Sequence, residues 1–354
     1  MENTKTADTL RNQLMNQKMK VDFNTYDFSI KELISMVGDK TINISPAYQR
    51  HFRWDKERQS QLIESFFLGI PVPNLFMATN ADSSWEVIDG VQRISTLINF
   101  AGTDEEREQL DVSGNKSALK LVGLDKLTEF NEKSFLDLPL DIQRKFKLTS
   151  IKVITLTDKS DMNVRFDLFE RLNRGGLTLT DQEIRSCVYR GPFNDFLREM
   201  SSNTDFHESV HISSKAEVNG KREEYVLRFF AYLYDYKSFE HSVKDFLNDF
   251  MEKANKNFDY QKNQMIFCKV FETLNSTLKN GITNTSINIT PANLFEGISV
   301  GAALAYKETG TINTDGINDW IKSDELKQYI AGATNSRKRV MGRIEFCKNK
   351  FEGR

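Results

Sequence analysis

The residues best placed to do chemistry follow an apolar stretch in the first third of the chain. Residues 85–88 have the composition of a strand, and Asp89 and Gly90 come directly after them. A helix is predicted to begin at once, so that Gln92 and Arg93 lie in its first turn. The start of a helix carries free N–H groups and a partial positive charge, which favour anions and disfavour an arginine. A bound phosphate would relieve this conflict.

The side chains at this turn suit a phosphate or nucleotide site. Gly90 can adopt a positive φ angle and let a ligand approach the backbone. Asp89 can accept a hydrogen bond from a hydroxyl group or hold a metal-bound water, and Gln92 can donate or accept. The alternative is an ordinary joint between strand and helix in which Arg93 pairs with Asp89. The residues alone leave both interpretations open.

Residues 46–54 concentrate donors and aromatic rings in a segment with no predicted helix or strand. Arg50 and Arg53 are spaced to grip phosphate, and Tyr48 or Trp54 can stack on a base. The alternative for the aromatic residues is burial in the core.

A loop after a predicted helix over residues 161–172 is a third candidate. Arg171 precedes Asn173 and a glycine pair that begins at Gly175. Asparagine and glycine are what an ordinary left-handed helix end uses, whereas an arginine-rich loop beside a phosphate turn can act as a clamp.

His207 and His211, with Glu208 between them, form a zinc-protease pattern. The surrounding residues predict a loop instead of a supporting helix, and no third ligand is evident. We therefore expect no metal site here.

The C-terminal residues 337–354 contain seven basic residues against two acidic ones. Such a segment can bind nucleic-acid phosphates, although a solvated helix face is the common explanation of a charge run. The candidate DNA contacts are Arg337, Lys338, Arg339 and Arg343.

Composition limits the class of protein. The 354 residues are 39% hydrophobic with a formal net charge of −2, so two folded domains are expected and any nucleic-acid binding must be local. Three scattered cysteines indicate neither a disulfide framework nor a cysteine metal cluster. We found no targeting segment and no apolar run of membrane-spanning length, and we expect a soluble cytoplasmic protein.

The helices and strands predicted around these residues indicate an α+β protein. Asp55 is a predicted N-cap, Gly69 a helix end, and residues 75–78 and 85–88 a hairpin. We expect a polar arm over residues 1–20, a mixed α/β domain over residues 21–158, and an all-helical domain over residues 159–354. Within the last, Thr180 and Glu183 form a capping box, Thr290 is a predicted cap, and residues 225–236 form a buried helix.

The motifs together resemble the N-terminal domain family of GmrSD-type restriction endonucleases, a ParB/sulfiredoxin-like group. The Asp-Gly-Gln-Gln-Arg motif of that family corresponds to residues 89–93, with Val91 in place of the first glutamine. The other shared segments, in the family's order, are Tyr48-Gln49-Arg50 with Trp54, residues 62–65, residues 69–73, and residues 169–173 with Gly175-Gly176. Arg174 also departs from the small residue that is usual there.

The resemblance implies a small ParB-like domain that binds a nucleoside triphosphate with magnesium. It places Tyr48, Gln49 and Arg50 in the same pocket as the turn at Gly90, with Arg171, Asn173 and Gly175 on the pocket side. Arg50, Arg93 and Arg171 would hold the phosphates, and Asp89 or Gln92 would position the attacking water. Independently of the resemblance, Glu64 lies one turn before the end of its predicted helix, where the macrodipole disfavours a carboxylate, and we expect it to pair with Arg50 or Arg93.

The function that follows is a nucleotide-binding, and nucleotide-hydrolysing, component of a DNA restriction or anti-phage defence system. The alternative is a non-hydrolytic module that binds DNA or senses its modification, in which Val91 reflects lost hydrolysis. Either form would act on DNA with a separate nuclease subunit. A zinc peptidase is the third, weaker hypothesis.

Overall fold

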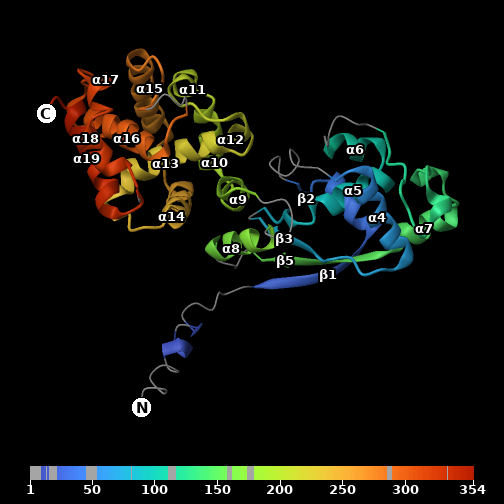
Figure 1. The fold of residues 1–354 in the computed structure, drawn as a ribbon. Helices are drawn as coiled ribbons and strands as arrows, with labels where there is room; N and C mark the ends of the chain where they lie inside the picture. The colour runs from blue at the N-terminus through green and yellow to red at the C-terminus, as the bar shows by residue number, and fades with distance from the viewer. Residues whose placement is uncertain are drawn as a thin grey trace. The chain divides into compact units, whose positions relative to one another are not determined.

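The computed structural model divides the chain into two compact units, Met1–Thr178 and Leu179–Arg354, which are described separately (Figure 1). The residues that the structure describes are 9–12, 14–15, 22–44, 54–80, 82–110, 117–157, 162–173, 179–284, 289–332 and 334–354. Of the predicted N-terminal arm, residues 9–12 and 14–15 are helical and exposed.

The first unit is built on a five-stranded mixed sheet in the order β1-β5-β3-β4-β2. The strands are β1 (Phe23–Ser29), β2 (Ile42–Asn43), β3 (Leu75–Thr79), β4 (Trp85–Asp89) and β5 (Ser150–Leu156). β1 pairs antiparallel with β5, and β3 pairs antiparallel with β4. The β3–β5 and β2–β4 pairs are parallel. The predicted mixed α/β core and its hairpin are therefore confirmed.

Helices cover this sheet, with α4 and α5 lying together (Figure 1). They are α2 (Ile30–Gly38), α4 (Lys56–Leu68), α5 (Val91–Ala101), α6 (Asp104–Leu110), α7 (Leu140–Leu148) and α8 (Met162–Asn173), with single turns η1 (Thr128–Phe130) and η2 (Phe135–Asp137). Rings of Phe66, Phe67, Phe100, Phe135 and Phe146 meet beneath them. This aromatic cluster fixes α4 and α5, the helices that flank the candidate site.

Local signals set the ends of α4. The Asp55 side chain accepts a hydrogen bond from the Arg58 N–H and so satisfies one of the free donors of the first turn. The helix ends at Gly69, which has a φ angle of 70°. An N-cap of the same kind begins α2, where the Ser29 hydroxyl accepts a hydrogen bond from the Glu32 N–H. The N-cap at Asp55 and the helix end at Gly69 follow the predictions from sequence.

α8 belongs to the sheet unit, although the sequence predicted that the helical domain begins at residue 159. The Arg165 guanidinium donates to the Thr79 carbonyl at 2.9 Å and to the Thr157 carbonyl at 2.7 Å. Thr79 ends β3, and Thr157 follows β5. Because these bonds tie α8 to two strands, the division between the units falls 20 residues later than expected, after Thr178.

All the described regular elements of the second unit are helical, as predicted. They are α9 (Asp181–Val188), α10 (Pro192–Ser201), α11 (Thr204–Ser209), α12 (Ser214–Val218), α13 (Lys221–Asp235), η3 (Tyr236–Ser238), α14 (Val243–Lys256), α15 (Tyr260–Thr277), α16 (Ala292–Thr309), α17 (Ile317–Trp320), α18 (Asp324–Ile330) and α19 (Arg337–Phe351). Rings of Phe206, Phe229, Phe267, Phe271 and Phe295 form much of its core.

Thr180 and Glu183 form the predicted capping box at the start of α9. The predicted cap at Thr290 is wrong by one residue, because Pro291 is the N-cap of α16. Thr290 instead accepts from the Tyr225 hydroxyl through its carbonyl, at 2.6 Å. No described helix has both the length and the apolar composition that crossing a bilayer requires.

Candidate functional site

The turn at Gly90 joins β4 to α5 as the sequence predicts. Gly90 is the N-cap of α5 and has a φ angle of 109°. A Cβ atom at this position would lie 2.2 Å from Leu75 Cδ2 and 3.2 Å from Arg93 Nη2. Glycine is therefore required by the conformation of the turn and by close packing against β3 and Arg93, independently of any ligand.

Arg93 is paired within the turn. Its Nη2 atom lies 2.7 Å from Asp89 Oδ2 and donates to the Asn74 carbonyl at 3.2 Å. The Arg93 side chain is 13% exposed, against 36% for Asp89. This is the alternative predicted from the sequence, an ordinary joint between strand and helix in which Arg93 pairs with Asp89. The arginine therefore holds Asp89 in place at the turn, and Asp89 is the member of the pair that solvent or a ligand can reach more easily.

The start of α5 keeps the features of an anion site. No side chain of the described residues caps the helix, and its first turn contains no acidic residue. By contrast, α4 has both a capping aspartate and an acidic residue, Glu57, in its first turn. An uncapped first turn presents N–H groups that an anion can accept.

Gln92 connects this turn to the donor-rich segment that precedes α4. Its Oε1 atom accepts a hydrogen bond from the Trp54 N–H at 3.3 Å. The Gln59 amide donates to the Trp54 carbonyl at 2.9 Å, and the Arg58 guanidinium lies 4.9 Å from the centre of the indole ring. Trp54 is half-buried, with a cation over its ring. The end of the segment therefore lies at the Gly90 turn, while Tyr48, Gln49, Arg50 and Arg53 fall outside the described residues.

Two further residues near the turn, Val91 and Glu86, are buried, which was not predicted from the sequence. Val91 is 5% exposed and so contributes to the core at the start of α5. Glu86 on β4 is 1% exposed. An acidic residue inside an otherwise apolar strand is the signal that marks Glu86 as unusual, since carboxylates are seldom buried without interactions.

Glu64 does not pair with Arg93, one of its two predicted partners, and the other, Arg50, lies outside the described residues. Its Oε1 atom accepts hydrogen bonds from the Lys126 and Leu127 N–H groups at 3.0 and 2.9 Å. The carboxylate therefore anchors the loop before η1 to α4. Such a partner, about 60 positions away in the chain, leaves no local trace in the sequence.

The third candidate segment is only partly described. Arg171 is exposed in the last turn of α8, and Asn173 is the final residue of that helix. Gly175 lies outside the described residues. The structure therefore provides an exposed cation at the end of α8, and the proposed clamp stays a prediction.

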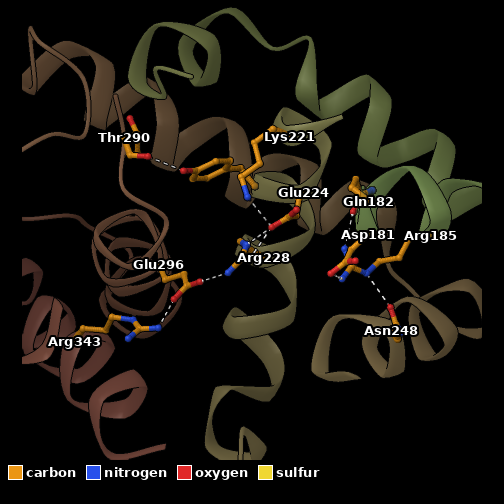
Figure 2. Close-up of polar contacts among 11 residues, drawn as sticks. Asp181, Gln182, Arg185, Lys221, Glu224, Arg228, Asn248, Thr290, Glu296 and Arg343 are labelled. Atoms are coloured by element: carbon orange, nitrogen blue, oxygen red, sulfur yellow. Dashed lines mark hydrogen bonds and ion pairs between the residues drawn. The ribbon is translucent and has the colours of Figure 1, made fainter. Parts of the chain in front are cut away.

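The prediction that Arg343 contacts DNA is wrong. It is fully buried in the helical unit, where its guanidinium pairs with Glu296 and donates to the Thr334 carbonyl at 2.7 Å. Glu296 also lies 2.6 Å from Arg228, so the three side chains form a buried chain of charges (Figure 2). The arginine lies on the core face of α19, which the basic composition of the segment conceals.

Only some of the other basic residues of the tail are exposed in a way that would let them contact phosphate. Arg337 and Lys338 are exposed, and Arg337 donates to the Lys237 carbonyl at 2.8 Å. Arg339 is half-buried and bonds the Ala331 carbonyl. Further along α19, Lys348 pairs with Glu308 and Glu352. Lys338 and, to a smaller extent, Arg337 are the candidates that remain for phosphate contacts.

The two histidines of the zinc pattern do not share a helix face. His207 lies in the short helix α11, so the prediction of a loop is wrong at this residue. The helix ends at Ser209, and His211 lies beyond it. Within the described ranges, no cluster of three or more His, Cys, Asp or Glu side chains is arranged to hold a metal.

Residues 30–190 match the family model of the GmrSD restriction endonuclease, N-terminal domain. This match confirms the resemblance predicted from the motifs, and it includes the Gly90 turn, α4 and α8. One similar solved structure is the "Structure of the C2221 form of Pnob8-like ParB-N domain", 12% identical over 94% of this chain and 96% of that chain, with a TM-score of 0.23. A TM-score of this size does not establish a common fold. No curated protein matches the chain.

Proposed function

We propose that the turn at Gly90 binds a magnesium-complexed nucleoside triphosphate, and that the protein is a nucleotide-dependent component of a GmrSD-type DNA restriction system. One observation carries this proposal. Within the segment that matches the family model, α5 begins at a positive-φ glycine, with no capping side chain among the described residues and no acidic residue in its first turn. The backbone there is suited to receive an anion.

The residues at the turn take separate roles in this proposal. The first N–H groups of α5 bind phosphate oxygens, and Asp89 contacts a hydroxyl group or a metal-bound water. Arg93 is a positioning residue, because its guanidinium holds Asp89 and the Asn74 carbonyl. Magnesium, when bound, would neutralise charge on the phosphates.

Hydrolysis requires a group that orients water toward the terminal phosphate. Asp89 suits this role better than Gln92, because Gln92 Oε1 already accepts from the Trp54 N–H. We further propose that the protein acts in the cytoplasm, contacts DNA, and depends on a separate nuclease subunit for cleavage. The family name of residues 30–190 supports this setting.

A panel of nucleotides, with and without magnesium, tests the proposal by calorimetric binding and by phosphate release. We expect saturable binding of at least one triphosphate. Asp89→Asn and Arg93→Ala should weaken it about 10-fold or more, since a charge-assisted contact contributes roughly 1.5–3 kcal/mol. Arg107→Ala is the matched control, because Arg107 also pairs with one aspartate, Asp104, and one carbonyl, that of Gly102.

Three results separate the hypotheses. Binding with phosphate release that Asp89→Asn abolishes supports a nucleotide hydrolase. Binding without release favours the alternative of a non-hydrolytic sensing module, in which the core-facing Val91 accompanies the loss of turnover. Absence of binding to every triphosphate, with circular dichroism showing a folded protein, would remove the assignment of the turn.

A further inference from the structure

A polar cavity of about 510 Å³ lies in the helical unit. Its walls come from His211, from the end of α15 and the loop that follows it as far as Thr283, and from Asn318, Ile321 and Lys322 in and after α17. This volume is within the range of roughly 300–1,000 Å³ that is typical of small-ligand sites.

The wall formed by His211 and the loop after α15 is fixed by backbone contacts. The Ile282 N–H donates to the Ser209 carbonyl, and the Thr290 N–H donates to the His211 carbonyl, both at 2.8 Å. Gly281 has a φ angle of 69°, and a Cβ atom there would lie 2.9 Å from His211 Cε1. The loop therefore packs directly on the imidazole, and only glycine permits this approach without strain.

The charge of the cavity has one sign. Lys279 and Lys322 are its charged side chains, and its described lining contains no carboxylate. Neither lysine forms an ion pair with a carboxylate in the described part of the chain, whereas Lys256 and Lys269 of the same unit pair with Glu252 and Glu272. Two ammonium groups beside a cavity that lacks a counter-ion favour an anionic ligand.

The remaining side chains of the lining indicate the chemistry of the uncharged part of the ligand. Its uncharged polar side chains, apart from the His211 imidazole, are amides and hydroxyls, and the described lining contains no Phe, Tyr or Trp ring on which a base could stack. The hydrogen-bonding members are Thr277, Asn280, Thr283 and Asn318. Such side chains suit a hydroxylated, non-planar group.

We propose that this cavity binds a sugar phosphate, with the phosphate held by Lys279 and Lys322 beside His211, and the sugar hydroxyls held by the amide and hydroxyl side chains. The ligand is either a free phosphorylated sugar or the sugar–phosphate backbone of a nucleic-acid strand. This site is separate from the proposed nucleotide site, because its lining does not include any residue of the Gly90 turn.

Binding of ribose 5-phosphate, ribose, inorganic phosphate and a short single-stranded oligonucleotide to the full chain tests the proposal by calorimetry. Lys279→Gln with Lys322→Gln should weaken binding about 10-fold or more, because each lysine provides a charge-assisted contact. Lys256→Gln with Lys269→Gln removes the same charge from exposed, ion-paired positions and should change affinity little. Circular dichroism and urea unfolding confirm that both variants fold.

Comparison of the four test ligands distinguishes the two possible sources of the sugar phosphate. Tighter binding of ribose 5-phosphate than of ribose or phosphate alone, weakened in the cavity variant, identifies a free sugar phosphate. Binding of the oligonucleotide alone, weakened in the same variant, identifies a nucleic-acid backbone. In both cases the imidazole NMR signal of His211, assigned with His211→Gln, should shift on titration. If no probe binds, or if the cavity and control variants bind equally, the proposal is overturned.

Discussion

At the scale of single residues, the Gly90 turn shows how one unusual position can have two explanations. The sequence places an arginine at a helix start, where the macrodipole disfavours it. The structure shows that Arg93 bonds Asp89 and the Asn74 carbonyl, which offsets this disadvantage. The arginine alone therefore does not establish a phosphate site. The first turn of α5 is the stronger argument, because no side chain in the described part of the chain caps it.

The same turn gives a prediction about stability. Gly90→Ala should lower the free energy of unfolding by about 2 kcal/mol or more, since a non-glycine residue at positive φ is strained by roughly 1–3 kcal/mol and the new Cβ meets Leu75. Urea unfolding measures this change. Gly69→Ala is the matched control, because Gly69 has a φ angle of 70° but no neighbouring atom within 4 Å. Equal losses in the two variants would show that the contact with Leu75 contributes nothing.

At the scale of elements, α19 shows that a basic run is not a basic surface. The helix places Arg343 in the core, against Glu296, and presents Arg337 and Lys338 to solvent. A helix distributes consecutive residues around its axis, so charges that are adjacent in sequence separate onto different faces. DNA binding by this segment stays a prediction that now depends on two exposed residues.

The salt dependence of DNA binding tests what remains of that prediction. Each phosphate contact contributes about −0.9 to the slope of log affinity against log salt concentration. Replacing Arg337 and Lys338 by glutamine should therefore flatten the slope by at most about 2 units. A fluorescence-anisotropy titration at increasing salt measures the slope. Lys256→Gln with Lys269→Gln again serves as the control, and identical slopes in all three proteins would exclude a role for α19 in DNA binding.

At the scale of the whole molecule, buried charges make the stability of the helical unit depend on pH. Figure 2 shows Glu224 between Lys221 and Arg228, with Arg228 continuing to Glu296. Burial alone would raise the pKa of Glu224, but the positive charges of Arg228, Lys221 and Arg185 outweigh it and lower the pKa to about 2. A carboxylate whose pKa is lower in the folded state stabilises the fold above its unfolded pKa of 4.5.

Stability should therefore fall as the pH drops from 4.5 toward 2. The contribution of Glu224 over that window is about 3 kcal/mol, from roughly 1.36 kcal/mol per pH unit. Glu224→Gln should reduce the dependence of the urea midpoint on pH in this window. It should also destabilise the protein at pH 7, because Arg228 loses one buried partner. Glu272→Gln, at an exposed ion pair, should leave the acid dependence unchanged. A wild-type curve that is flat below pH 4.5 would contradict this account.

The sequence alone determined the features that depend on near neighbours. The N-cap at Asp55, the helix end at Gly69 and the capping box of Thr180 with Glu183 all follow from residues within three or four positions of the helix ends. The hairpin of β3 and β4 follows from two short apolar segments separated by a polar turn. The motif at residues 89–93 was informative for the same reason, because strand, glycine and helix start are adjacent in the chain.

Only the tertiary structure decided which side chains meet across long separations. Arg343 pairs with Glu296, Glu64 anchors a loop some 60 residues away, and Arg165 ties α8 to two strands. His211 lines its cavity with lysines that are distant in sequence, so the pattern it shares with His207 was misleading. A charged side chain that is buried must find a partner wherever the packing brings one. That partner is set by the arrangement of whole helices, and no local pattern of residues encodes it.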